Sequence, residues 1–98
     1  MSLPVIFLPL AEKDILDAED HFATISEHLS DRFINELDRT VQIIVQHSGG
    51  FQKIVGEFRQ APLDVFPFVI VYQIIKDAIV IFRLFHTRQD PQLKFIGE

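Results

Sequence analysis

The chain has 98 residues, of which 48% are hydrophobic and 23% are charged, and its formal net charge is −5. This length and composition indicate one globular domain over residues 1–98 and argue against a disordered chain. The absence of cysteine excludes disulfides, thiolate zinc sites and a cysteine nucleophile, and the negative charge argues against simple non-specific binding to a polyanion.

The sequence gives no signal for a membrane or for secretion. No apolar run reaches the ~18 residues that a membrane-spanning helix needs. The apolar stretch at residues 4–10 is too short for the hydrophobic region of a signal peptide and lacks a basic flank. We therefore expect a cytoplasmic protein without a membrane partner.

Charge is distributed unevenly along the chain. Residues 1–50 carry three basic and nine acidic side chains, whereas residues 51–98 carry six basic and five acidic ones. A surface that faces an anion should therefore come from the second half. The alternative is that the acids of the first half form no more than a solvated helix face.

The first half predicts a short strand at residues 4–8 and then two helices. Pro9 suits the first turn of a helix, where a missing N–H has no cost. One apolar stripe at spacings of three and four follows from Leu10 and comprises Ile15, Ala18, Phe22, Ile25 and Leu29. Ser30 or Asp31 can cap a second helix. Its buried side is predicted to hold Phe33, Ile34, Leu37, Val41, Ile44 and Val45, before Gly49 and Gly50 end it.

The second half predicts strands. Residues 66–75 and 78–86 are almost continuously apolar and β-branched, and Lys76 and Asp77 form a polar turn between them. Residues 57–63 predict a third strand at or near an edge, because Pro62 cannot donate to a ladder. The order β-α-α-β-β-β indicates an α+β fold, with a mainly antiparallel sheet and a two-helix hairpin packed on one face.

The residues most suited to chemistry stand at the end of the last strand. They are Arg83, His86 and Arg88. Strict alternation along the strand places Leu84 and His86 on one face and Arg83 on the other. A histidine beside arginines could transfer protons and bind a phosphate. The alternative is an interfacial histidine and salt-bridged arginines.

Other polar residues give weaker signals. Arg59 could add a further cation to the same surface, or pair with Glu57 or the acidic helix face. Tyr72 lies in an apolar run and is more typical of a core tyrosine with a bonded hydroxyl than of a catalyst. His21 and His28 are seven residues apart, which does not match the i, i+4 spacing of a helical zinc motif. We expect neither a metal site nor a cofactor.

Two motifs in the second half are fairly specific when they occur together. They are F-P-F-V-I-V-Y at residues 66–72 and R-L-F-H-T-R-Q-D-P at residues 83–91. P-L-A-E-K-D at residues 9–14, residues 32–37 and Arg59 precede them. In this order the segments cover nearly the whole chain and resemble the RelE/ParE family of toxins from type II toxin–antitoxin (plasmid stabilisation) modules, whose compact β-α-α-β-β-β fold is the order predicted above.

The resemblance implies a toxin that is neutralised by an antitoxin from the same operon. RelE-like members cut mRNA on the ribosome, whereas ParE-like members are described as poisoning DNA gyrase. Val69 stands where RelE-like members carry a catalytic arginine, and no tyrosine follows His86. We therefore expect a ParE-like toxin that inhibits growth by binding a macromolecular target such as DNA gyrase through Arg83, His86 and Arg88.

Two alternatives stay open. A RelE-like, metal-independent mRNA endoribonuclease would use Arg59, Arg83 and Arg88 to stabilise phosphate charge and His86 as general acid or base. It requires His86 and at least two of these arginines to converge on one open concavity. The second alternative is an inactive structural relative in which the same residues form salt bridges.

Partner surfaces follow from the same interpretation. A cognate antitoxin should cover exposed apolar surface, either by strand addition or as a helix in a groove. The apolar residues 93–96 suit packing back onto the domain or a homodimer contact.

Overall fold

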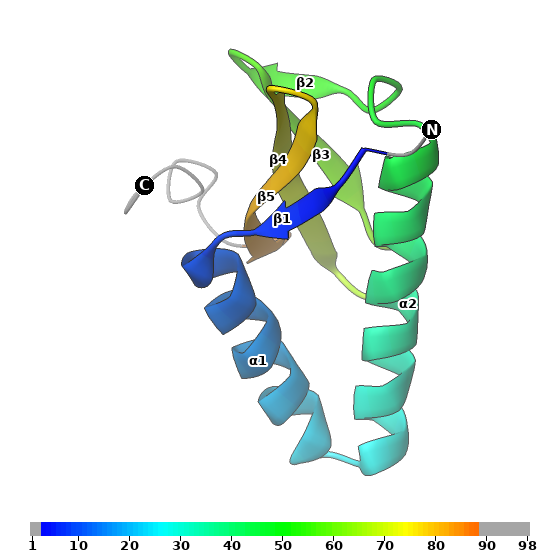
Figure 1. Cartoon of the computed structure of the whole chain (residues 1–98). Helices are drawn as coiled ribbons and strands as arrows, with labels where there is room; N and C mark the ends of the chain where they lie inside the picture. Colours follow the sequence, from blue (N-terminus) through cyan, green and yellow to red (C-terminus); the bar gives the residue numbers. More distant parts are fainter. Residues whose placement is uncertain (1–2, 89–98) are drawn as a thin grey trace.

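The computed structural model describes residues 3–88, which form two helices and one five-stranded sheet (Figure 1). The elements in chain order are β1 (Val5–Phe7), α1 (Pro9–Ala23), α2 (Glu27–Gln46), β2 (Lys53–Val55), β3 (Phe58–Pro62), β4 (Phe68–Ile75) and β5 (Ala78–His86). The predicted α+β class is confirmed, and β2 is added to the predicted order. The predicted homodimer contact at residues 93–96 lies outside the described residues.

The strands are ordered β1-β5-β4-β3-β2 across the sheet. β2 to β5 pair with their neighbours in sequence and are antiparallel, whereas β1 runs parallel to β5 at the opposite edge. The first and last strands are therefore neighbours. The chain that leaves β1 and enters α1 consequently passes beside the second half of β5, where the candidate residues lie (Figure 1).

α1 begins and ends with local features that the sequence shows only in part. Pro9 occupies its first turn, as predicted. The helix ends at Ala23, so the predicted stripe extends too far: Ile25 lies in the link between the helices and Leu29 belongs to α2. The link is short, and the two helices form the predicted hairpin.

The N-cap of α2 is Ser26, and the predicted caps Ser30 and Asp31 are wrong. The Ser26 hydroxyl oxygen accepts a hydrogen bond from the Leu29 N–H at 3.0 Å, which satisfies one of the free donors of the first turn. Ser30 is buried instead, and its hydroxyl donates to the Glu19 carbonyl of α1 at 3.2 Å. The helix therefore starts one turn earlier than the sequence suggested.

The main core lies between the helices and one face of the sheet. α1 contributes Ala11 and Ala18, and α2 contributes Phe33, Leu37 and Ile44. The sheet residues in this core are Ala61, Ile70, Tyr72, Ile79, Ile81 and Leu84, and the loop between β3 and β4 adds Leu63 and Phe66. A smaller cluster on the other face of the sheet joins Val69, Val71 and Phe85, with Ile54 and Phe58 packed against it. Burial on both faces explains the continuous apolar run of β4.

A β-bulge interrupts β5 and overturns the predicted alternation. Tyr72 on β4 pairs with Ile81, but the preceding residue Val71 pairs with Arg83, so Phe82 is an extra residue. Leu84 consequently lies in the same core as Ile81, although strict alternation had separated their faces. The bulge therefore changes which side chains in the second half of β5 face the helices.

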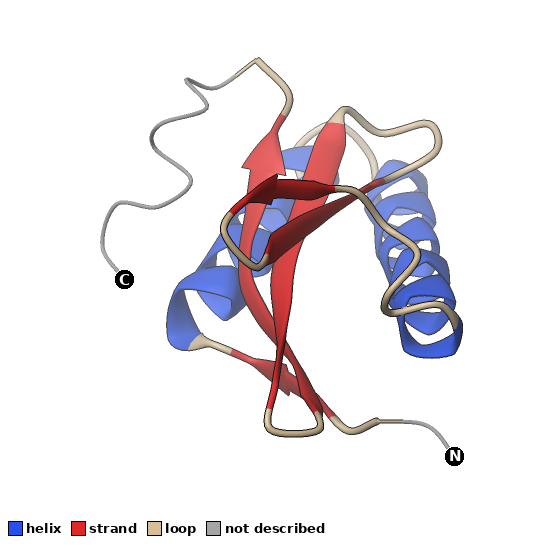
Figure 2. Ribbon diagram, turned by 90° about the horizontal axis from the view of Figure 1, so that it is seen from above, coloured by secondary structure: helices blue, strands red, loops and turns tan. Residues whose placement is uncertain are grey.

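The turns between the late strands explain their pairing. Lys76 and Asp77 both have positive φ, at 48° and 64°, as a two-residue type I′ hairpin requires. Pro62 ends β3, which lies near an edge of the sheet, as predicted, with β2 outside it as the edge strand. β2 reaches only Phe58 and Arg59 of β3, so the missing N–H of Pro62 breaks no ladder. Figure 2 shows these strands and the loops that join them from above.

Candidate functional site

The end of β5 brings His86 and Arg88 together. His86 pairs with Phe68 on β4, and the two rings meet edge to face with their centroids 5.2 Å apart. The Arg88 backbone N–H donates to Nδ1 of His86 at 3.1 Å, and the Thr87 N–H donates to the Pro67 carbonyl at 2.8 Å. Nδ1 is thus an acceptor, and the geometry assigns the proton of a neutral ring to Nε2.

A pocket of about 350 Å³ adjoins His86 on the helix side of the sheet. Its lining residues are Asp14, Asp17, Ala18, His21, Phe68, Leu84 and His86. The charged side chains in this lining are the two aspartates of α1, and none of the candidate arginines contributes to it. Such a lining is poorly suited to a phosphate, because the carboxylates would repel it.

Arg83 is engaged with α1. Its Nε donates to Oδ2 of Asp14 at 2.7 Å and its second terminal nitrogen donates to Oδ1 at 3.1 Å, which is a bidentate ion pair. Only 16% of the Arg83 side chain and 18% of the Asp14 side chain are exposed. The guanidinium carbon also lies 4.6 Å from the centroid of the Phe85 ring. Arg83 therefore joins the helix to the bulged strand.

Arg59 lies elsewhere on the sheet. It pairs with Tyr72 across β3 and β4, four residues along β4 from the partner of His86, which corresponds to roughly 13 Å of strand. Its guanidinium donates to the carbonyls of Gly49 at 3.2 Å and Phe51 at 2.6 Å. Arg59 thus fastens the segment between α2 and β2 to the sheet.

Tyr72 is a core tyrosine with a bonded hydroxyl, which is the interpretation that the sequence favoured. Its side chain is fully buried, and its hydroxyl donates to the Ser48 carbonyl at 2.6 Å. Burial raises the pKa of Tyr72 above its usual value of 10.0, and the nearby Arg59 charge opposes this increase. The hydroxyl therefore stays protonated and holds the same segment that Arg59 holds.

The four sequence-predicted residues consequently divide into two groups. His86 and Arg88 share the end of β5, and Arg83 on the same strand is held by Asp14 of α1, while Arg59 is on a different part of the sheet. The pocket beside His86 is acidic and aromatic. This arrangement can make hydrogen-bonding, aromatic and ionic contacts with a partner.

Sequence reasoning missed two acidic residues with specific roles. Asp14 accepts the Leu84 N–H at 3.1 Å in addition to the Arg83 pair. Glu36 on α2 is buried, and a single oxygen, Oε2, accepts the N–H groups of Val65 and Phe66, each at 3.0 Å. Nothing in the one-dimensional pattern separates these two from the seven other acids of the first half, because their partners are 29 to 70 residues away along the chain.

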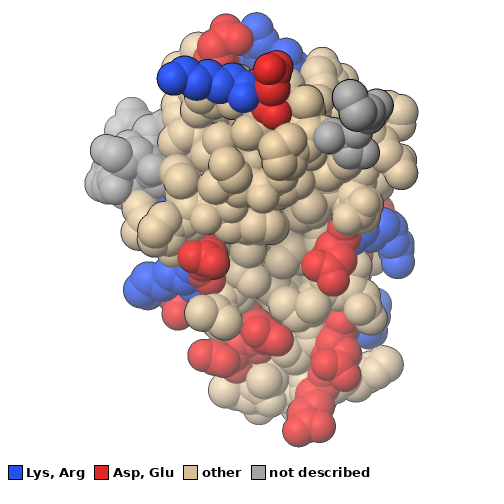
Figure 3. Space-filling model, in the orientation of Figure 1, with Lys and Arg blue, Asp and Glu red and all other residues tan. Residues whose placement is uncertain are grey.

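An apolar groove of about 330 Å³ lies between β1, α1 and α2. It is lined by Phe7, Glu12, Ile15, Leu16, Ile34, Leu37 and Asp38. Leu16 is 58% exposed although it is a large apolar side chain. Figure 3 shows acidic side chains in two groups over the helices, with uncharged surface between them. The groove therefore combines an apolar floor with acidic margins.

Residues 3–88 contain neither a membrane-spanning helix nor a cluster of metal ligands. Neither helix of this part of the chain is both long and apolar enough to cross a bilayer. Likewise, no three His, Asp or Glu side chains in the same range are grouped so that they could hold a metal ion.

Comparisons with known proteins identify relatives. The sequence model of the family described as "ParE toxin of type II toxin-antitoxin system, parDE" matches residues 5–91. A solved chain from the chromosomal ParDE TA system of P. aeruginosa has a similar fold, with a TM-score of 0.78 and 18% sequence identity over 88% of this chain and 97% of that chain. The comparison with curated protein sequences gave no significant match.

Proposed function

Because the chain belongs to the ParE toxin family of type II toxin–antitoxin systems, we propose that it inhibits growth by binding DNA gyrase with the surface at the end of β5. One observation carries this proposal: His86 and Arg88 lie together, whereas Asp14 holds Arg83 and loop carbonyls hold Arg59. Such an arrangement supports contact with a partner. An endoribonuclease would need several of these groups around one phosphate.

A pair of assays tests the target. The purified protein is added to a DNA gyrase supercoiling assay and, separately, to ribosomes translating a defined mRNA. We expect inhibition of supercoiling and intact mRNA. The double variant His86→Ala/Arg88→Ala should inhibit gyrase at least about tenfold less, because two polar contacts are removed. Lys13→Ala, an exposed basic residue on α1, is the control and should inhibit like the wild type.

The opposite results identify the alternatives. Cleavage of mRNA without an effect on gyrase would mean a RelE-like endoribonuclease. No effect in either assay, and no effect on growth, would mean an inactive relative. Equal gyrase inhibition by the wild type and the double variant would reject the end of β5 as the contact surface.

A cognate antitoxin neutralises the toxin in this proposal, with an amphipathic helix in the groove between α1 and α2. Support comes from the exposed Leu16 and from the apolar lining that Ile15, Ile34 and Leu37 complete. Glu12 and Asp38 at the margins favour basic residues beside the apolar face of that helix. Both proposed partners are encountered in the cytoplasm, which we propose as the location of the protein.

Growth measurements test neutralisation. The protein is expressed from an inducible promoter, alone and together with the product of the neighbouring gene in its operon. We expect growth arrest in the first case and rescue in the second. Arrest that co-expression does not relieve, with no complex between the two purified proteins, would contradict this proposal.

A further inference from the structure

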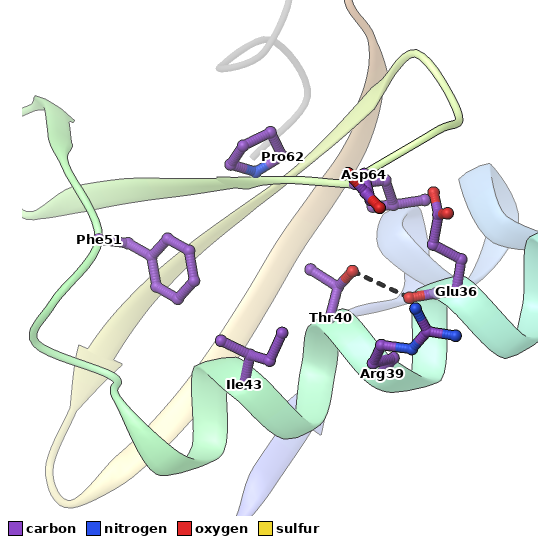
Figure 4. Close-up of a pocket in the computed structure, with 8 residues that line it drawn as sticks. Glu36, Arg39, Thr40, Ile43, Phe51, Pro62 and Asp64 are labelled. Carbon is purple, nitrogen blue, oxygen red and sulfur yellow. Dashed lines mark hydrogen bonds between the residues drawn. The ribbon is translucent and has the colours of Figure 1, made fainter.

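A second recessed surface lies between α2 and the loop that joins β3 to β4. It consists of two adjoining pockets of about 410 Å³ and about 270 Å³, which share Glu36, Arg39 and Asp64. None of the residues that line it lines the groove between the helices or the pocket beside His86. We call this surface the α2–loop cleft; Figure 4 shows its larger pocket.

The walls of the α2–loop cleft are fixed by buried hydrogen bonds. Glu36 accepts the N–H groups of Val65 and Phe66, which ties the loop to α2. The Thr40 hydroxyl donates to the Glu36 carbonyl at 2.9 Å within the helix (Figure 4). These carboxylate and hydroxyl groups already have partners inside the protein. The cleft is therefore preformed. A ligand would be bound by the lining side chains other than Glu36 and Thr40.

The two ends of the α2–loop cleft differ in chemistry. One end is apolar and consists of Ile43, Phe51, Pro62 and Leu63. The other end carries Arg39, with Arg32 and Asn35 in the adjoining pocket. Arg39 and Ile43 are one helical turn apart, so their Cβ atoms lie about 6 Å from each other.

Three of the six other lysines and arginines in residues 3–88 form an ion pair, whereas the arginines of the cleft do not. Lys13 pairs with Asp17, Lys53 with Glu57 and Arg83 with Asp14. Over residues 3–88, by contrast, no ion pair joins Arg32 or Arg39 to an acid. Two cations thus face one recess on a half of the chain that is otherwise strongly acidic.

We propose that the α2–loop cleft is a docking site for a protein segment that carries an Asp or Glu beside a bulky apolar residue. The apolar side chain enters the end formed by Ile43, Phe51 and Leu63, and the carboxylate pairs with Arg39. Arg32 extends the positive surface for a second acid.

The charges around the cleft favour an acidic protein segment over a nucleic acid. Asp64 lines both pockets and would repel a run of phosphates, whereas one carboxylate can lie on the Arg39 side. The net charge of −5 opposes a polyanion further. This inference does not depend on the gyrase target or on the groove between the helices.

Chemical-shift titrations of the full-length, ¹⁵N-labelled protein test the docking site with two probes. 3-Phenylpropionate carries a carboxylate about one helical turn from a ring, and 3-phenylpropionamide has the same shape without the charge. We expect saturable shifts of the amide signals of residues 39–43, 51 and 63–66 with the acid, and about three- to fivefold weaker binding of the amide.

Variants and a second ligand class complete the test. Arg39→Met keeps the helix and an unbranched side chain but removes the charge, and it should reduce binding of the acid to the level of the amide. Lys13→Met removes the same charge from an exposed position on α1 and should leave binding unchanged. The acetylated tripeptide amide Phe-Ala-Glu should bind more tightly than Phe-Ala-Gln and depend on Arg39 in the same way.

Three outcomes would overturn the docking site. They are equal binding of acid and amide, signals that shift outside the cleft, and an unchanged affinity of Arg39→Met. Binding of an oligothymidylate at the cleft that Arg39→Met abolishes would instead assign the surface to a nucleic acid.

Discussion

The carboxylate of Asp14 on α1 takes the place of a neighbouring strand along β5, beyond the point where β1 ends. β1 pairs with β5 only as far as Phe7 and Ile81, and the next backbone contact is the Leu8 N–H with the Ile81 carbonyl at 3.0 Å. Beyond this point Oδ2 of Asp14 accepts the Leu84 N–H, while both carboxylate oxygens hold Arg83. One side chain thus satisfies the exposed edge of β5 and fixes α1 against the bulge.

Removal of Asp14 should destabilise the fold strongly. In Asp14→Ala the Arg83 guanidinium stays largely buried without its partner, and the Leu84 N–H loses its acceptor. We expect a loss of about 2–4 kcal/mol in the free energy of unfolding, measured by urea denaturation. Asp17→Ala, which removes an exposed acid three residues away, should change it by less than about 1 kcal/mol.

A double-mutant cycle tests whether this loss of stability comes from the ion pair between Asp14 and Arg83. Arg83→Met alone should also be destabilising, but addition of Arg83→Met to Asp14→Ala should cost less than the two single changes together. Strictly additive losses would mean that the two side chains do not stabilise each other, contrary to the geometry.

Glu36 should act through the position of one oxygen rather than through its charge. Since Oε2 alone accepts both loop N–H groups, Glu36→Gln can keep both hydrogen bonds with its amide oxygen. Glu36→Ala leaves the two donors without an acceptor and should cost about 2–3 kcal/mol, against less than about 1 kcal/mol for Gln. Thermal denaturation gives the stabilities, and amide exchange of Val65 and Phe66 should accelerate in the Ala variant only. Equal destabilisation by both variants would assign the role to the charge.

Tyr72 should make stability decrease in alkaline solution. Its pKa is above 10.0 in the folded protein because of burial, whereas the unfolded chain titrates near 10.0. In the pH interval between these two values the folded state holds more protons, so the free energy of unfolding falls as pH rises. The contribution is complete below pH 10 and is lost as pH increases through the folded-state pKa.

Tyr72→Phe provides the comparison. At neutral pH it should cost about 1 kcal/mol, because the hydrogen bond to the Ser48 carbonyl is lost. Its stability should decrease less than that of the wild type when urea denaturation is repeated above pH 10. Parallel pH profiles of the two proteins would contradict the assignment.

Leu16→Arg should prevent neutralisation by the antitoxin without unfolding the toxin. Leu16 is 58% exposed and lines the groove between α1 and α2, so a charge there opposes an apolar helix but not the fold. Co-expression should no longer restore growth, and the purified proteins should not form a complex. Ile25→Arg is a matched control, since Ile25 is 63% exposed in the link between the helices and does not line the groove. If both variants are still neutralised, the antitoxin binds elsewhere.

The two helices and the β4–β5 hairpin were accessible from the sequence because they depend on local periodicity. Apolar spacings of three and four defined the two helices, and β-branched runs around Lys76 and Asp77 defined the hairpin of β4 and β5. β2 escaped notice because three residues at an edge carry too little pattern. Ser26 was overlooked as a cap because the apolar stripe continues through the link between the helices.

The candidate site depended on long-range contacts that no local pattern contains. The sequence placed Arg83, His86 and Arg88 near one another, and it marked Arg59 as a cation that could reach them. Only the tertiary structure decided that Phe82 is inserted as a bulge, that Arg83 turns to Asp14, and that Arg59 holds a loop on another part of the sheet. The physical reason is that period and composition determine which face of an element is apolar, whereas the partner of a charged side chain is set by where distant elements meet.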